Sequence, residues 1–282
     1  MKRYKKEANG KLEVGQVMYT KRSVLTVDRA LCKGCELCKL VCPREAISLI
    51  PAEPQNGKVV APRVDIDESK CDFHGICAVV CPFAAIRISI NGDETLPAVA
   101  KEVFPLLTRD IRCDESRCPA DCRDCETACP LHIIEADEGV KIQKELCAGC
   151  LVCETECPKD AIRLTKFIEG SIAITLEHCP EGCRACLDVC PVNALGSGED
   201  GRVFAKNVHC IFCGACKLVC PGEDALKIER TAIRHTPVNS GAWNRGLEKL
   251  TSTGALIREL AADGVDRARD AVHNLLTEED AE

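Results

Sequence analysis

Six cysteine-rich units of nearly the same design constrain how this chain can fold. They contain all but one of its 24 cysteines, and they read CKGCELCKLVCP at 32–43, CDFHGICAVVCP at 71–82, CPADCRDCETACP at 118–130, CAGCLVCETECP at 147–158, CPEGCRACLDVCP at 179–191 and CIFCGACKLVCP at 210–221. The third and fifth units share an extra residue and an internal Pro, whereas the fourth and sixth keep the shorter CxxCxxCxxxCP form. This alternation predicts that consecutive units pair, first with second, third with fourth and fifth with sixth.

The flanks of the units repeat as well. A short extended stretch that ends in an acidic or polar residue precedes the first cysteine, as in LTVDRALC, VDIDESKC and ITLEHC. A run rich in β-forming residues follows the proline, as in AISLI, AIRISI and AIRLT. Each unit is therefore predicted to be a strand, a cysteine loop, about one helical turn and a second strand.

Composition and the absence of a secretory signal argue against disulfides as the role of the cysteines. The N-terminal MKRYKKEANGKLEVG has no apolar segment typical of a secretory signal, and no window approaches the roughly 18 apolar residues of a membrane span. A cytoplasmic protein with no membrane span is expected, and structural disulfides are rare in that compartment. A net charge of -7 and an aromatic content of 3% disfavour a nucleic-acid-binding surface, which leaves a zinc ribbon as a formal alternative only.

The spacing of the cysteines favours iron–sulfur clusters over zinc or disulfides. C-x2-C-x2-C-x3-C-P is the bacterial iron–sulfur run, whose fourth cysteine binds the other cluster of a pair. Three thiolates two residues apart wrap three corners of a cubane, while the fourth lies on the next turn and points away. The proline ends that turn and removes an amide that would need a partner. Six such runs predict six clusters.

Beyond the repeat, the chain resembles a polyferredoxin, with similarity to the bacterial two-cluster ferredoxins over residues 23–230. The order of the units, the CPxxCxxCxxxCP variants, the segment VFPLLTRDIRCDESRCPADC and the tail RTAIRHTPVNSGAW resemble the polyferredoxin subunit of formylmethanofuran dehydrogenase from methanogenic and related archaea. The resemblance implies an α+β fold of three tandem ferredoxin-like two-cluster modules with short strands and helical turns. The expected organisation is an N-terminal extension at 1–22, modules at 23–100, 101–172 and 173–230, and a helical docking segment at 231–282.

The resemblance also implies which residues bind each cluster. The first module would use Cys32, Cys35, Cys38 and Cys81 for one site and Cys42, Cys71, Cys77 and possible ligand His74 for the other. The second module would use Cys118, Cys122, Cys125 and Cys157, then Cys129, Cys147, Cys150 and Cys153. The third would use Cys179, Cys183, Cys186 and Cys220, then Cys190, Cys210, Cys213 and Cys216. Five of the six sites are expected to hold 4Fe-4S clusters, and the site beside His74 either a His-ligated 4Fe-4S or a 3Fe-4S cluster.

His74 stands where the sixth unit has Cys213. One interpretation is a vacant position that leaves three thiolates and a 3Fe-4S cluster or a labile fourth iron. A second is ligation by the neutral imidazole, and a third is rescue by Asp72 or Cys113. A neutral ligand makes a cluster less negative, so imidazole ligation predicts that this site has the highest potential of the six, or one of the highest.

Cys113 is the cysteine outside the units. CDESRC at 113–118 aligns with IDESKC at 66–71, which places Cys113 at the position of Ile66 on a lead-in strand. A small buried hydrophobe fits that position. The alternatives are a ligand in place of Cys118 and a replacement for the thiolate missing beside His74.

The function that the resemblance implies is electron transfer. No GxGxxG, P-loop, GxSxG or HExxH pattern is present, so a non-catalytic subunit is expected. Its partners would be the catalytic and electron-donor subunits of a tungsten or molybdenum formylmethanofuran dehydrogenase, in a hetero-oligomer. The alternatives are a subunit of a hydrogenase or heterodisulfide reductase, and an enzyme with an open iron near His74. After Arg230 an amphipathic helix is predicted over Thr253–Leu276, packed on the modules or docked to a partner.

Overall fold

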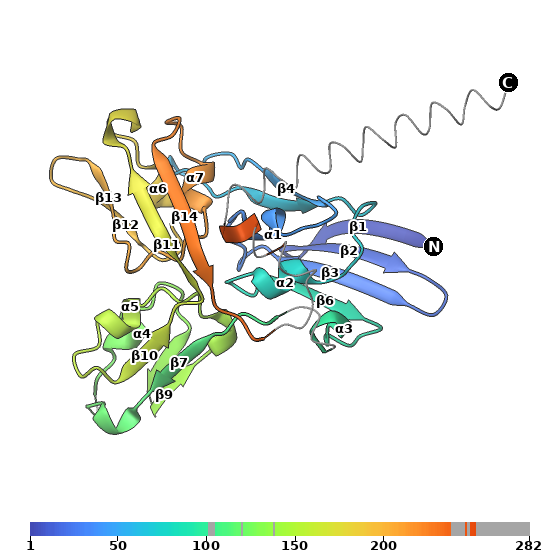
Figure 1. Cartoon of the computed structure of the whole chain (residues 1–282), viewed down its shortest axis with the longest axis horizontal. Coiled ribbons are helices and arrows are strands. Elements are labelled where there is room, and N and C mark those ends of the chain that lie inside the picture. The colour runs from blue at the N-terminus through green and yellow to red at the C-terminus, as the bar shows by residue number, and fades with distance from the viewer. Residues whose placement is uncertain (101–104, 120, 138, 238–245, 247–248, 252–282) are drawn as a thin grey trace.

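Three small modules follow one another in the computed structural model, which describes residues 1–100, 105–119, 121–137, 139–237, 246 and 249–251. Each module has the order strand, helix, two-stranded hairpin, helix, strand. In Figure 1 the second and third modules occupy the lower and upper left, and the first module lies to the right with the N-terminal strands. The structure thus confirms the predicted arrangement of strand, cysteine loop, helical turn and strand.

The bounds of the elements show how regular the repeat is. The first module consists of β3 (Arg22–Asp28), α1 (Leu37–Leu40), β4 (Ile47–Ile50), β5 (Arg63–Ile66), α2 (Ile76–Val80) and β6 (Ile86–Ile90), followed by α3 (Pro97–Ala100). The second consists of β7 (Asp110–Cys113), α4 (Asp124–Ala128), β8 (Ile134–Asp137), β9 (Gly139–Ile142), α5 (Val152–Thr155) and β10 (Ile162–Thr165). The third consists of β11 (Ile168–Ile174), α6 (Ala185–Asp188), β12 (Leu195–Ser197), β13 (Val203–Ala205), α7 (Ala215–Leu218) and β14 (Leu226–Ile233). Single 3-10 turns, Glu115–Arg117, Lys144–Leu146 and Leu176–His178, precede three of the cysteine loops.

Strand pairing joins the two halves of every module. The first and last strands pair antiparallel, with Leu25 opposite Ile88 in the first module and Ile172 opposite Ile228 in the third. The inner hairpin is antiparallel too, with Leu49 opposite Val64 in the first module. The two short helices of each module contact one another, α1 with α2, α4 with α5 and α6 with α7. The units are therefore paired as their alternation predicts.

The N-terminal residues continue the sheet of the first module. Strands β1 (Lys2–Ala8) and β2 (Lys11–Val17) form a hairpin, and the four-stranded sheet has the order β1-β2-β3-β6. Strand β2 buries Leu12 and Val14 against the module, while β1 keeps most of its side chains exposed. The hairpin therefore gives the first module a wider sheet than its two neighbours.

Cysteines make up a large share of the buried core. One cluster of buried side chains runs through the first and third modules and includes Ala148 and Cys150 of the second, and another lies within the second module. Helices of four or five residues cannot be stable by themselves, because nucleating a helix costs more than so few hydrogen bonds return. These helices must therefore be stabilised by packing and by the group that the cysteine loops bind.

The C-terminal segment is described only in part. Strand β14 extends to Ile233, and Leu250 is buried in the larger core cluster. The helix predicted over Thr253–Leu276 lies outside the described residues. Among the helices of the described ranges, none is long and apolar enough to cross a membrane.

Candidate iron–sulfur sites

Two small cavities in the third module are lined by the predicted groups of cysteines. Each has about 310 Å³ that no atom fills, part of which is open to solvent. The first is lined by Cys179, Cys183, Cys186 and Cys220, and the second by Cys190, Cys210, Cys213 and Cys216. In both, the remaining lining is mainly aliphatic side chains and prolines. Cys220 belongs to the sixth unit and Cys190 to the fifth, so the fourth cysteine of each unit crosses to the cavity of the other.

The cysteines of the first module come together in the same crossed way. Burial is the main cause that raises the pKa of the Cys77 thiol, and facing Cys71 and Cys42 add to the effect. For Cys38 burial again raises the pKa most, and the nearby thiols are Cys77, Cys81 and Cys32. The fourth cysteines, Cys42 and Cys81, therefore each face the other unit.

In the second module the inner group is the more closely gathered. Burial raises the pKa of Cys153 to about 12, with additions from Cys150, Cys147 and Cys129. The outer group is more exposed. Burial raises the pKa of Cys125, and Cys122 and Cys118 add to it. Cys157 is half-buried on the turn after α5, and its Sγ accepts the amide of Ala161 at 3.3 Å.

Backbone amides fix the direction of the crossing sulfurs. In four of the units the Sγ of the fourth cysteine accepts the amide of an alanine four residues later, at distances of 3.2 to 3.4 Å. The acceptors are Cys42, Cys81, Cys157 and Cys190. An N–H donor to sulfur stabilises the thiolate form and orients it, as outer hydrogen bonds do around metal ligands. The turn that the proline begins therefore aims the fourth cysteine.

The donor set fits a group larger than one ion. All 24 cysteines lie in the described residues and none forms a disulfide. Burial raises the pKa of Cys150 and Cys186 to about 11 and of Cys213 to about 12, so these thiols ionise only if a bound cation compensates them. In the described part of the chain, no three Cys, His, Asp or Glu side chains converge on a point where one ion would be held. In the third module the four cysteines of each group line a common cavity, as the ligands of a cubane must.

His74 takes the loop position of a cysteine and also its hydrogen bond. The Ile76 amide donates to His74 Nδ1 at 3.4 Å. In the sixth unit the corresponding amide, from Ala215, donates to the side chain of Cys213. Burial lowers the pKa of His74, which favours the neutral ring. His74 is thus placed beside the thiols of its unit as a hydrogen-bond acceptor.

Cys113 lies beside a predicted ligand on the outer side of the second module. It ends strand β7 opposite Ile162, as Ile66 ends β5 opposite Ile47. Its Sγ lies 3.9 Å from the Sγ of Cys118, and burial together with Cys118 raises its pKa to about 12. Cys113 therefore occupies the predicted apolar strand position as a thiol that contacts Cys118, and it lies in a different module from His74.

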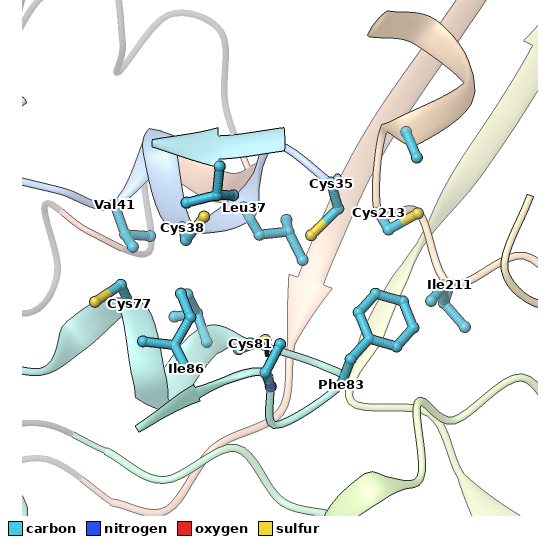
Figure 2. Packing of buried hydrophobic residues seen from close by; sticks show 14 of the residues in the cluster. Cys35, Leu37, Cys38, Val41, Cys77, Cys81, Phe83, Ile86, Ile211 and Cys213 are labelled. Carbon is cyan, nitrogen blue, oxygen red and sulfur yellow. Dashed lines mark hydrogen bonds between the residues drawn. The ribbon is translucent and has the colours of Figure 1, made fainter. Parts of the chain in front are cut away.

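Three of the six predicted sites lie where the three modules contact one another. The Glu36 amide donates to the carbonyl of Cys213 at 3.3 Å, and Cys213 is close enough to Cys35 to raise its pKa. Figure 2 shows Cys35 beside Cys213, with Phe83 and Ile211 filling the space below them. Arg230 joins the same modules through a 2.8 Å ion pair with Glu36, in which the Arg230 side chain is buried and the Glu36 side chain is partly buried.

The second module reaches this centre through two cationic side chains. Arg109 donates to the carbonyls of Cys81 at 2.6 Å and Cys147 at 3.0 Å, which lie in the first and second modules. Lys166 donates to the carbonyl of Cys210 at 2.7 Å and also faces Cys150. The central sites are thus those of Cys35 and Cys81, Cys147 and Cys150, and Cys210 and Cys213. We call the other three the outer sites; they are those of Cys71 and Cys77, Cys118 and Cys122, and Cys179 and Cys183. Nothing in the spacing of the cysteines indicates Arg109 or Lys166.

The comparisons with known proteins follow the same three modules. A family model described as a 4Fe-4S dicluster domain matches residues 31–85, and a second of that description matches residues 176–226. Between them, a model described as the LdpA Fe-S cluster-binding domain matches residues 118–168. Each matched segment contains one pair of units.

Known relatives include single ferredoxins and a polyferredoxin-like subunit. The chain is 49% identical over 65 residues, 23% of its length, to "Ferredoxin 7Fe" of Hydrogenibacillus schlegelii and covers 72% of that protein. It is 33% identical over 127 residues, 44% of its length, to the polyferredoxin-like subunit of the aliphatic sulfonate oxidoreductase of Pyrococcus furiosus, and it covers 58% of that subunit.

A solved structure matches nearly the whole chain. It is a chain of the formate dehydrogenase–heterodisulfide reductase–formylmethanofuran dehydrogenase complex from Methanospirillum hungatei, at a TM-score of 0.81 and 30% identity. The match covers 89% of this chain and 92% of that one. The predicted fold of three ferredoxin-type modules is confirmed. The chain therefore belongs to the ferredoxin family of 4Fe-4S iron–sulfur proteins, as a polyferredoxin-like member with three cluster-binding domains in tandem.

Proposed function

We propose that this chain relays low-potential electrons within a tungsten or molybdenum formylmethanofuran dehydrogenase complex, as a non-catalytic subunit. The observation that carries the proposal is the likeness to the Methanospirillum chain, which extends over 89% of this chain and therefore includes the arrangement of all three modules. Similarity to one ferredoxin domain would support electron transfer without indicating a complex.

The six predicted groups of cysteines are the proposed cluster ligands. In the third module they line two small cavities, which supports their assignment most directly. Iron–sulfur clusters supply reversible one-electron transfer when bound. The chain's own contribution is to hold four sulfurs around each of five spaces and three around the sixth, to donate backbone amides to them and to exclude water with aliphatic side chains.

At the site of Cys42, Cys71 and Cys77 we propose a 3Fe-4S cluster bound by three thiolates. A thiolate has several lone pairs, so it can accept a hydrogen bond from an amide and bind iron at the same time. The Nδ1 of neutral imidazole has one lone pair, and Ile76 occupies it. With Nδ1 unprotonated, Nε2 carries the proton and cannot bind iron either. His74 therefore stands beside the cluster and does not complete it. The name of one relative also specifies seven irons.

Reconstitution of the complex tests the proposed function. The cluster-loaded chain, immobilised under anaerobic conditions, is exposed separately to purified formylmethanofuran dehydrogenase, heterodisulfide reductase, formate dehydrogenase and hydrogenase modules. The expected result is capture of the first, with electron transfer from a reduced ferredoxin to its catalytic subunit only when this chain is present. Capture of another module alone would assign the chain to that enzyme instead. The matched chain comes from a complex that also contains heterodisulfide reductase and formate dehydrogenase, so these two enzymes are the second candidates for the partner.

A further inference from the structure

One cationic side chain occupies the equivalent place in each module. The first cysteine of the second, fourth and sixth units accepts a hydrogen bond on its carbonyl from a side chain outside the unit. Arg3 donates to Cys71 at 3.2 Å, Arg109 to Cys147 at 3.0 Å and Lys166 to Cys210 at 2.7 Å. Among the described residues, no arginine donates to the corresponding carbonyls of the other three units, which are those of Cys32, Cys118 and Cys179.

Each cation also binds the turn just before its cysteine. Arg3 donates to the carbonyls of Glu68 and Ser69, Arg109 to that of Glu145 at 2.6 Å, and Lys166 to that of Asn207 at 3.2 Å. Carbonyls that converge at the end of a turn carry partial negative charge and attract a cation, as at the end of a helix. The three side chains therefore have the same electrostatic setting.

Three separate segments of the chain supply these side chains. Arg3 comes from β1, Arg109 precedes β7 and Lys166 precedes β11. Ser23 stands as far before Cys32 as Arg109 stands before Cys118, so the first module has no cation at the matching position. Its N-terminal hairpin brings Arg3 to the equivalent carbonyl instead. The same type of carbonyl is thus reached from two unrelated positions, the loop before the first strand and the N-terminal hairpin, which indicates that a cation is favoured there.

The charges also lie close to the proposed cluster ligands. Each cationic nitrogen is 2.7 to 3.2 Å from the carbonyl oxygen of Cys71, Cys147 or Cys210. A positive charge this close to a ligand favours an added electron on a cluster that the ligand binds. Removing the charge must lower the reduction potential.

We propose that Arg3, Arg109 and Lys166 are positioning residues that raise the potential of the cluster bound by the second unit of each module above the potential that its thiolates alone would give. The inference rests on the proposed function, because it assumes electron-carrying clusters at these sites. Electrons in the second and third modules would then settle on the central clusters, those of Cys147 and Cys210, rather than on the outer sites.

The test is a redox titration of the full chain, followed by electron paramagnetic resonance. Arg3→Gln, Arg109→Gln and Lys166→Gln should each leave iron content unchanged and make reduction of one cluster about tenfold less favourable, equivalent to about 59 mV for a one-electron couple. Arg109→Lys and Lys166→Arg, which keep the charge, should restore most of the potential. Arg112→Gln is the matched control, because Arg112 is exposed and pairs with Asp110.

The outcomes separate the inference from the proposed function. Midpoints that stay in place in all three Gln variants, with iron content intact, would overturn the inference. Shifts that the charge-keeping variants also show would overturn it too, because geometry and not charge would then be the cause. Selective shifts in a chain that fails to bind formylmethanofuran dehydrogenase would support the inference and reject that partner. A purified chain that cannot be loaded with iron and sulfide would reject both.

Discussion

His74 and Cys213 occupy the same position in their loops, but sulfur and imidazole nitrogen differ in what they can do there. Both accept the amide two residues later. Cys213 keeps lone pairs for iron after accepting it, whereas His74 Nδ1 does not. The sequence alignment shows the substitution, and the hydrogen bond supports our proposal that the ring is an acceptor and not a ligand.

Iron content should therefore respond to His74→Cys and not to His74→Ala. The chain as it stands should bind about 23 irons, five clusters of four and one of three. His74→Cys should raise this to about 24 and lower the potential of that site, because the added thiolate brings a negative charge. An iron and acid-labile sulfide assay, with the resonance of the oxidised three-iron cluster, provides the measurement. Loss of cluster iron in His74→Ala would mean that the imidazole is a ligand.

Cys113 gives the outer site of the second module a spare thiol. Its Sγ lies 3.9 Å from that of Cys118, while the third module has Ile174 at the corresponding place before Cys179. Cys118→Ser should therefore keep its cluster through Cys113, whereas the matched Cys179→Ser should lose about four irons. Cys113→Ser alone should leave the iron content unchanged.

The double variant Cys113→Ser, Cys118→Ser completes this experiment. It should lose the cluster that each single variant keeps, and iron analysis of the four proteins measures the effect. If Cys118→Ser loses as much iron as Cys179→Ser, the thiol of Cys113 cannot move into the ligand position, and the residue serves only in packing.

At the scale of elements, the strands and turns follow from the local pattern, but the contacts between modules do not. The register of β4 with β5 recurs in β7 with β10 because both obey the same repeat, so the Ile66 position could be assigned to Cys113 by alignment. The ion pair between Glu36 and Arg230 joins residues 194 positions apart and has no counterpart in the repeat. The N-terminal hairpin likewise joins the first module through strand pairing that no motif indicates.

That ion pair should be important to how the first and third modules hold together. The side chains of Arg230 and Glu36 are 7% and 16% exposed, and Arg230 also donates to the Phe212 carbonyl at 2.8 Å. Arg230→Met should cost about 3 kcal/mol, because it leaves the Glu36 carboxylate buried without its partner. Glu36→Leu combined with Arg230→Met should recover much of this loss, since the unpaired charge is removed.

Anaerobic guanidinium unfolding, followed by cluster absorbance, measures these differences between variants. Glu169→Gln is the control, because Glu169 pairs with Arg234 at the surface and such pairs contribute about 1 kcal/mol or less. An Arg230→Met protein as stable as this control would show that the two modules hold together without the pair.

At the scale of the whole molecule, the order of sites in space differs from their order along the chain. A linear wire in sequence order would pass from the first module through the outer site of the second before reaching its inner site. The structure instead brings Cys35 next to Cys213, and links Cys81 to Cys147 and Cys150 to Cys210 through single side chains. Cysteine spacing determines which sulfurs share a site. The junction, by which we mean the place where the three central sites meet, depends on residues between the modules whose positions no motif predicts.

The junction predicts which cluster losses interrupt electron flow. Cys122→Ser combined with Cys125→Ser removes the outer site of the second module, and it should leave equilibration between the first and third modules at its normal rate, because Cys35 and Cys213 connect them directly. Cys213→Ser combined with Cys216→Ser removes the central site of the third module and should isolate the outer cluster of Cys179 and Cys183. Pulsed reduction followed by rapid freezing and electron paramagnetic resonance measures how fast the clusters equilibrate. A sequence-ordered wire gives a different result for the first variant, since loss of the outer site would then separate the first module from the third. Slow equilibration in that variant, with the remaining clusters intact, would contradict the junction.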